Sequence, residues 1–147
     1  METLASPIVP LSWGELIDKI TILEIKRERI DLPEAHAHVL HEHRLLSGIG
    51  ALALQIEAVR LLSDDLRRVN ATLWDVEEAI RDAEAMGDFG PEFVRLAQSV
   101  YKTNDLRAAL KRRINDLLGS QLVEEKSYAA ATTSAEADVD LLIAPAG

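Results

Sequence analysis

Hydrophobic positions along residues 12–30 recur at helical spacing on two sides of one helix. At about 100° per residue, most of them fall on one arc, which carries Leu16, Ile17, Ile20, Leu23 and Ile30. Ile22 and Ile25 lie on the opposite side. A helix with one solvated face needs only a single apolar stripe. We therefore expect this helix to lie between neighbours, with Leu16, Ile20 and Leu23 toward the core of a hairpin formed by the later helices. Ile22 and Ile25 should face the second helix or a second subunit.

Polar residues predict where this helix begins and ends. Ser12 can accept from the amide of Glu15, and Glu15 can reach back to the amide of Ser12, which is the pattern of a capping box. Pro33 disfavours a helical conformation at the residue before it. The first helix should therefore end near Asp31.

A second helix is expected over residues 34–62, with Pro33 in its first turn. Its apolar side would comprise Leu40, Leu46, Ala53, Ile56 and Val59. Gly48 and Gly50 interrupt the pattern, and each glycine costs about 0.5–1 kcal/mol relative to alanine. A bend or break at this point and close packing of a neighbouring helix are both open explanations.

The third and fourth helices carry the clearest periodicity. After Ser63-Asp64-Asp65, which is typical of a helix start, apolar residues recur at spacings of three and four: Leu66, Val69, Leu73, Val76, Ile80 and Ala83. Gly87 fits the left-handed position after a helix. Pro91 then begins a helix that runs to a stop at Gly119. The short connection between them predicts an antiparallel hairpin.

These patterns predict an all-α fold, an antiparallel bundle of about four helices over residues 1–128. Residues 120–128 would form one more helical turn or an arm. Residues 129–147 are rich in Ala, Thr and Ser and are expected to form a loosely held, low-complexity tail.

Composition narrows the function classes. The net charge of −9 and the aromatic content of 4% disfavour nucleic-acid binding, which needs a basic surface or stacking side chains. The absence of cysteine excludes disulfides and thiolate chemistry. No window approaches the roughly 20 apolar residues of a membrane span, and residues 1–11 do not resemble a signal peptide. We expect a cytoplasmic protein without a cofactor.

Four histidines lie close together in the sequence, at His36, His38, His41 and His43. Histidine is a common metal ligand. On a helix, however, the four form two pairs on opposite sides, and neither pair has the i,i+4 spacing of a helical metal site. We therefore predict a solvated helix face rather than a metal site.

Polar residues interrupt the stripe of the fourth helix. Thr103 and Arg107 lie in line with it, beside Asn104 and Lys111. In an antiparallel hairpin they would lie near Asn70, Trp74 and Asp75, and Glu24 of the first helix could face the same level. Two interpretations stay open: a structural network of Glu24, Asp75 and Arg107, or an anion or ligand site of Arg107, Lys111, Asn104 and Asn70. No catalytic residue can be named.

Charge is also segregated along the hairpin. Residues 73–88 carry a net charge of −5 and residues 101–116 a net charge of +3. The bases at 107–113 should lie beside Arg67 and Arg68, so this end of the hairpin is locally basic. A solvated helix end and a site for an anionic partner are the two interpretations.

Several stretches resemble a family of small bacterial helical proteins of unknown function. They are Gly14 to Lys26 (GELIDKITILEIK), Leu73-Trp74-Asp75, Gly87 to Pro91 (GDFGP), Val100-Tyr101 with Thr103-Asn104-Asp105, and Val123 to Tyr128 (VEEKSY). The resemblance implies a helical protein without assigned catalytic residues. Its members accompany sugar-transfer and tetratricopeptide proteins, which points to surface-polysaccharide biology.

The functional expectation is an interaction or accessory module, with a small-molecule or anion-binding protein around Arg107 as the alternative. As partners we expect a second copy of the chain, with a dimer favoured and Ile22 and Ile25 in the contact, and a further protein. We expect neither nucleic acid nor membrane as a partner.

Overall fold

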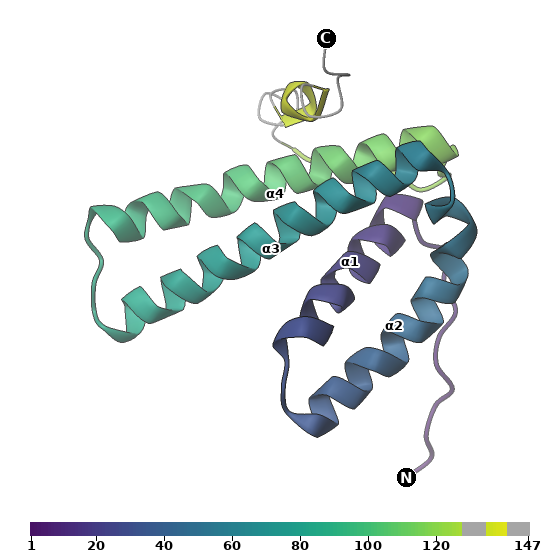
Figure 1. The fold of residues 1–147 in the computed structure, drawn as a ribbon, viewed down its shortest axis with the longest axis horizontal. Coiled ribbons are helices and arrows are strands. Elements are labelled where there is room, and N and C mark those ends of the chain that lie inside the picture. Colours follow the sequence, from purple (N-terminus) through teal and green to yellow (C-terminus); the bar gives the residue numbers. More distant parts are fainter. Residues whose placement is uncertain (128–134, 141–147) are drawn as a thin grey trace.

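The computed structural model describes residues 1–127 and 135–140. It confirms an all-helical bundle, built from α1 (Trp13–Arg29), α2 (Pro33–Leu54), α3 (Glu57–Ala85) and α4 (Pro91–Leu118). Helices α3 and α4 form a long antiparallel hairpin, and α1 lies between this hairpin and α2, which occupies the edge of the molecule (Figure 1). No helix among the described residues is both long enough and apolar enough to cross a membrane.

The ends of α1 and of the hairpin follow the local signals. The Ser12 side chain accepts from the amide of Glu15 at 3.1 Å and caps α1. The carboxylate of Glu15 turns instead to Lys111 of α4. Gly87 and Gly119 adopt positive φ just after α3 and α4, as expected of residues that end a helix.

The boundary between the second and third helices differs from the prediction. The chain leaves the helical path at Gln55 and Ile56, and α3 begins at Glu57 and runs through Ser63 without a break. The apolar repeat of α3 begins earlier than the predicted first position, Leu66. Val59 and Leu62 are also buried, and they continue the same spacing toward the start of the helix. The cap-like polar residues after Leu62 therefore lie inside a helix whose buried stripe outweighs their local preference.

Close packing, rather than a break, accounts for Gly50. Helix α2 is continuous through Gly48 and Gly50. A Cβ atom on Gly50 would lie 2.8 Å from Cδ1 of Ile20, so α1 and α2 approach closely here. Nothing lies within 4 Å of the same position on Gly48, which faces away from α1.

Two residues of the main stripe of α1, Leu16 and Ile20, face α2 instead of the expected hairpin core. Ile20 contacts α2, and Leu16 lines a groove with Leu46 of α2, whereas Ile17 joins the core of the α3–α4 hairpin. Ile25, only 3% exposed, is covered within the single chain. Ile25 is therefore not accessible to a second subunit while the bundle stays folded, Ile22 is half-buried, and the expected dimer through these two residues stays a prediction.

The chain after α4 returns along the bundle. Residues 120–127 are not helical and form an extended arm. Residues 135–140 form a short helix whose Ala135 and Val139 are buried in the same core as α3 and α4. The remainder of the predicted tail, and Tyr128, lie outside the described residues. The division of the chain at residue 128 stays a prediction.

Candidate functional site

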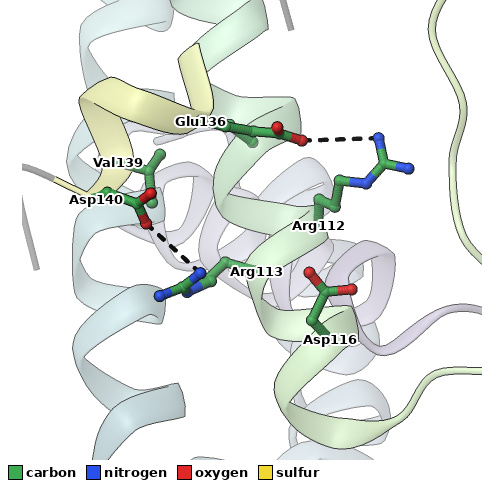
Figure 2. A pocket seen from close by; sticks show the side chains of 7 residues that line it. Arg112, Arg113, Asp116, Glu136, Val139 and Asp140 are labelled. Carbon is green, nitrogen blue, oxygen red and sulfur yellow. Dashed lines mark ion pairs between the residues drawn. The ribbon is translucent and has the colours of Figure 1, made fainter. Parts of the chain in front are cut away.

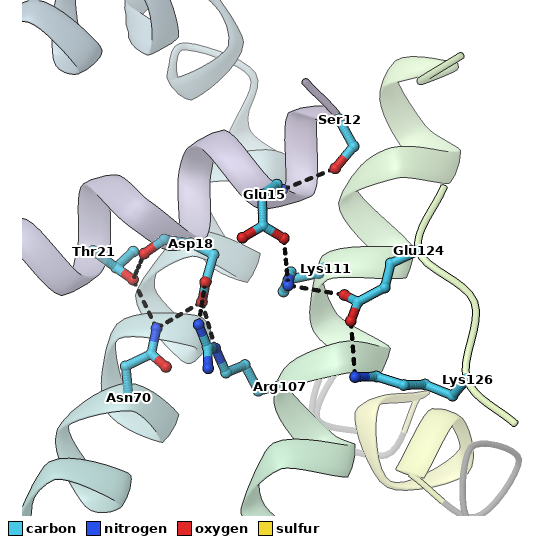
Figure 3. Close-up of polar contacts among 9 residues, drawn as sticks. All are labelled: Ser12, Glu15, Asp18, Thr21, Asn70, Arg107, Lys111, Glu124 and Lys126. Atoms are coloured by element: carbon cyan, nitrogen blue, oxygen red, sulfur yellow. Dashed lines mark hydrogen bonds and ion pairs between the residues drawn. The ribbon is translucent and has the colours of Figure 1, made fainter. Parts of the chain in front are cut away.

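A buried ion pair between α1 and α4 lies at the centre of the candidate site (Figure 3). Nε of Arg107 donates to Oδ1 of Asp18 at 2.8 Å, and Nη2 donates to Oδ2 at 2.5 Å. Asp18 is only 1% exposed, whereas the Arg107 side chain is about a quarter exposed. This two-bond geometry is the strongest form of a carboxylate–guanidinium pair. The hydrogen bond from Arg107 to Asp18 raises the pKa of the guanidinium.

Helix α3 joins the same network through Asn70. Its Nδ2 atom donates to Oδ1 of Asp18 at 2.9 Å and to Oγ1 of Thr21 at 3.0 Å. The Thr21 hydroxyl in turn donates to the main-chain oxygen of Asp18. Oδ1 of Asn70 is buried and accepts no hydrogen bond from the described residues. Three helices are thus held in register by one carboxylate.

A second cluster, one helical turn away, surrounds Lys111. Its Nζ atom lies 2.7 Å from Glu15 and 2.9 Å from Glu124, and Glu124 also pairs with Lys126 at 2.8 Å. Burial by itself would lower the pKa of Lys111, but the hydrogen bonds to the two glutamates outweigh it and raise the pKa. Lys126 and Lys111 lower the pKa of Glu124 to about 2, against the opposing effect of partial burial.

Helix α1 reaches α4 most closely at Gly14. The amide of Gly14 donates to Oδ1 of Asn115 at 2.7 Å. A Cβ atom at this position would lie 2.4 Å from the main-chain oxygen of Lys111, closer than atoms can pack. Only glycine therefore allows α1 to bring Asp18 and Glu15 to the bases of α4.

The structure brings some of the predicted site residues together and separates others. Arg107 and Asn70 meet on one carboxylate, and Lys111 lies in the adjoining cluster. Asn104 is half-buried, and its side chain forms no hydrogen bond with the described residues. The two expected acidic partners of Arg107 lie elsewhere: Asp75 pairs with Arg29, and Glu24 pairs with Arg67.

The residue that the sequence analysis missed is Asp18. It belongs to a line on α1 that starts with the small or polar residues Gly14, Asp18 and Thr21, at spacings of four and three, and continues to the apolar Ile25. A hydrophobic stripe draws attention to the other side of α1, yet this line faces the hairpin. An unpaired cation in the stripe of α4 requires a carboxylate on a facing helix, and Asp18 is the acid on that line.

These contacts are those of a structural network. The donors of Arg107 and Lys111 that would hold an anion are engaged by carboxylates of the chain itself. An anionic ligand would have to displace Asp18 or Glu124 to bind. The network fixes the register of α1, α3 and α4, and the anion site at Arg107 stays a prediction.

The basic end of the hairpin also receives acids from the same chain. Arg112 pairs with Glu125 and lies 3.8 Å from Glu136, and Arg113 lies 3.5 Å from Asp140. Figure 2 shows Glu136 and Asp140 on the short helix 135–140. Both acids line a cavity of about 170 Å³ together with Arg112 and Arg113. The chain itself therefore supplies anionic partners to the basic patch.

The four histidines lie on two sides of α2, with His36 and His43 half-buried. His36 contacts the main-chain oxygen of Arg27, and His43 contacts Ser47 and lies 3.8 Å from Glu24. His38 and His41 are exposed. Over residues 1–127 and 135–140, no group of three or more His, Cys, Asp or Glu is placed to hold a metal ion.

The far half of the hairpin extends beyond the other helices (Figure 1). Helix α3 has 29 residues and is about 43 Å long, whereas the 17 residues of α1 span about 26 Å. None of residues 74–108 is buried. We refer to residues 76–103 as the distal arm.

The distal arm carries an apolar seam that its two helices cover only in part. The half-buried seam consists of Val76, Ile80, Ala83, Phe93, Leu96 and Val100. Phe89 packs edge-on against Phe93 at 5.2 Å and is itself exposed. Val94 and Tyr101, seven residues apart on α4, are also exposed. The distal arm thus exposes apolar side chains in a region that α1 and α2 do not cover.

Comparison with known proteins identifies a family without a known activity. Neither the curated proteins nor the solved structures contain a match to this chain. A family model matches residues 8–140, which is most of the chain and includes α1 to α4 and the short helix. The chain therefore belongs to the family of unknown function DUF6165.

Proposed function

We propose that this protein is an interaction module whose distal arm binds a helix of another protein. The observation that supports the proposal is the uncovered apolar seam of the arm, in which no side chain is buried although the bundle behind it has a continuous core. Two helices alone cannot enclose a seam. A third helix laid along it would bury the residues that water now reaches.

Charge indicates the chemistry of that helix. Residues 73–88, which comprise the end of α3 and the start of the turn after it, carry six acids against one arginine. Of these acids only Asp75 forms an ion pair with a described residue, and Glu77, Asp82 and Glu84 form no side-chain hydrogen bond with the described residues either. On the α3 wheel Glu77 and Glu84 flank one side of the seam and Asp82 flanks the other. A partner helix with an apolar stripe bordered by Lys or Arg would match both features.

The arm supports a function better than the polar network does. Arg107 and Lys111 are already neutralised within the chain, so an anion-binding function would have to compete with buried carboxylates. The link to surface-polysaccharide biology comes from the family resemblance alone, and the proposal does not depend on it.

Site-specific photo-crosslinking tests the proposal. A photo-reactive phenylalanine analogue is placed at Val94 or at Tyr101, and at Leu61 as a control that is similarly exposed but lies outside the arm. After irradiation in the cells that produce the protein, the arm positions should yield one discrete product, and Leu61 should not. The crosslinked peptide should belong to a basic amphipathic helix.

A charge-reversed arm provides the matched control. The triple variant Glu77→Lys, Asp82→Lys and Glu84→Lys changes exposed residues that have no ion-pair partner among the described residues, so the helical content should be unchanged. Crosslinking at Val94 should fall at least tenfold in this variant. Equal crosslinking in both proteins, or a crosslinked peptide of acidic character, would contradict the proposal.

A further inference from the structure

A second apolar surface lies at the opposite edge of the molecule, on the outer face of α2. Leu45, Ile49 and Leu52 follow each other at spacings of four and three and are 58%, 62% and 77% exposed. Ile56, directly after the helix, is also about half exposed. At about 100° per residue Leu45, Ile49 and Leu52 fall on one arc, next to the side of α2 that carries the buried Gly50 and Ala53. We refer to Leu45, Ile49 and Leu52 as the α2 stripe.

The apolar surface continues from the α2 stripe onto the first residues of the chain. Ile49 and Leu46 form a groove of about 410 Å³ with Ile8, Val9 and Leu11. These three residues are exposed on their other sides. The patch is therefore wider than one helix face, as a stable contact between proteins requires.

The patch differs from the rest of the surface in its charge. Residues 45–56 (LLSGIGALALQI) contain no charged side chain, although the chain as a whole carries a net charge of −9. A basic partner would find no counter-charge here. An interfacial membrane contact normally pairs an apolar helix face with a flanking row of Lys and Arg, and that row is absent from residues 45–56.

We propose that the α2 stripe pairs with the α2 stripe of a second copy of this chain. A two-fold contact brings the same patch from both subunits together, so an uncharged apolar face is complementary to itself. Two such faces meet without the repulsion that two acidic surfaces would incur at this net charge. The distal arm lies at the other end of the molecule and stays accessible in such a dimer (Figure 1).

Mass measurement of the full-length chain tests this pairing. Light scattering after size exclusion should give about twice the chain mass of 16.2 kDa at high concentration. Ile49→Glu should weaken self-association at least tenfold and leave the helical circular dichroism unchanged, because Ile49 is exposed in the single chain. Val94→Glu, a substitution at a half-exposed position on the distal arm, should leave the mass unchanged.

Cysteine crosslinking locates the contact independently, because the natural chain has no cysteine. Under mild oxidation Ile49→Cys should form a covalent dimer at least tenfold faster than Val94→Cys. A chain that is monomeric over about a hundred-fold range of concentration would overturn the proposal. So would a dimer that persists in Ile49→Glu, or one that crosslinks faster through Val94→Cys. Binding of the monomer to anionic lipid vesicles through Ile49 would also overturn it.

Discussion

At the scale of single residues, one carboxylate decides how three helices meet. Asp18 accepts from Arg107 and Asn70 in a site that water barely reaches. A buried pair of this kind adds little net stability when complete, because burying two charges costs about as much as their attraction returns. Removing only one of the two partners is costly, because the other charge is then buried without a partner. The network therefore specifies the arrangement more than it stabilises the fold.

Substitution Asp18→Asn should show this asymmetry. It keeps the shape of the side chain and removes the charge opposite Arg107. We expect a loss of about 2–4 kcal/mol in the free energy of unfolding, at or below the usual range for a broken buried pair because Arg107 is partly exposed. Urea denaturation measures it.

A double variant separates pairing from general damage. Arg107→Met in the Asp18→Asn chain should recover part of the loss, because no unpaired guanidinium remains. Strictly additive effects of the two substitutions would show that the pair is not coupled in the fold.

Gly14 provides a steric prediction at the same scale. Gly14→Ala places a methyl group against the main chain of Lys111, so the helix must shift, and we expect a loss of about 1–3 kcal/mol. Gly48→Ala is the matched control, because its site is open and a helical alanine should gain about 0.5–1 kcal/mol. Thermal unfolding of both variants in dilute solution compares them. A stabilised Gly14→Ala would mean that α1 does not touch α4 here.

At the scale of elements, ion pairs attach the non-helical segment 120–127 to α4. Glu124 connects this segment to Lys111 of α4, and the pKa of Glu124 is lowered to about 2. A carboxyl whose folded pKa is depressed stabilises the fold above its ordinary pKa of 4.5. That contribution is lost as the pH falls from 4.5 toward 2.

The pH dependence of Glu124→Gln tests this contact. The variant should be less stable than the natural protein at neutral pH, and the difference should close as the pH falls from 4.5 toward 2. Urea unfolding at a series of pH values gives both curves. Lys126→Ala should shrink the effect, because Lys126 is a partner of Glu124. A difference that does not change with pH would exclude the ion pairs as its cause.

Helix α3 should differ in stability along its length. Leu66 is fully buried in the bundle, and Leu66→Ala should cost about 2–5 kcal/mol. Ile80 lies on the half-covered seam of the distal arm, and Ile80→Ala should cost less than half as much. Denaturant unfolding compares them. Amide hydrogen exchange should also be faster along the distal arm than in α1. Equal protection of the two regions would contradict this gradient.

At the scale of the whole molecule, two apolar surfaces lie at opposite ends of one bundle. The distal arm is flanked by acids and suits a basic helix, whereas the α2 stripe is uncharged and suits a copy of itself. A dimer through α2 would present two arms. The module would then bind a partner with two identical helices more tightly than a partner with one.

The histidine segment gives a prediction for the whole protein as well. The described His, Asp and Glu side chains form no group that could hold a metal ion. Treatment with EDTA should therefore leave the melting temperature unchanged. A clear fall that zinc restores would instead place a metal in the fold or between two copies.

Much of the secondary structure was determined by short-range signals in the sequence. Helix ends are marked by Ser12, Pro33, Pro91 and Gly119. A capping side chain, a proline with fixed φ and a left-handed glycine each influence only the few residues next to them in the sequence. The same holds for the antiparallel hairpin, whose connection is short. The candidate site was predictable only in part: Arg107 and Asn70 were identified, and the residue that joins them was not.

Tertiary structure alone decided which side of α1 faces which neighbour. Both sides carry isoleucines, so local periodicity does not distinguish them. The choice depends on Gly14, which allows close contact with α4, and on Asp18, which must meet Arg107. It also depends on Gly50, whose lack of a side chain allows Ile20 to pack against α2. These contacts join residues far apart in the chain, and their free energies exist only once the helices are packed together.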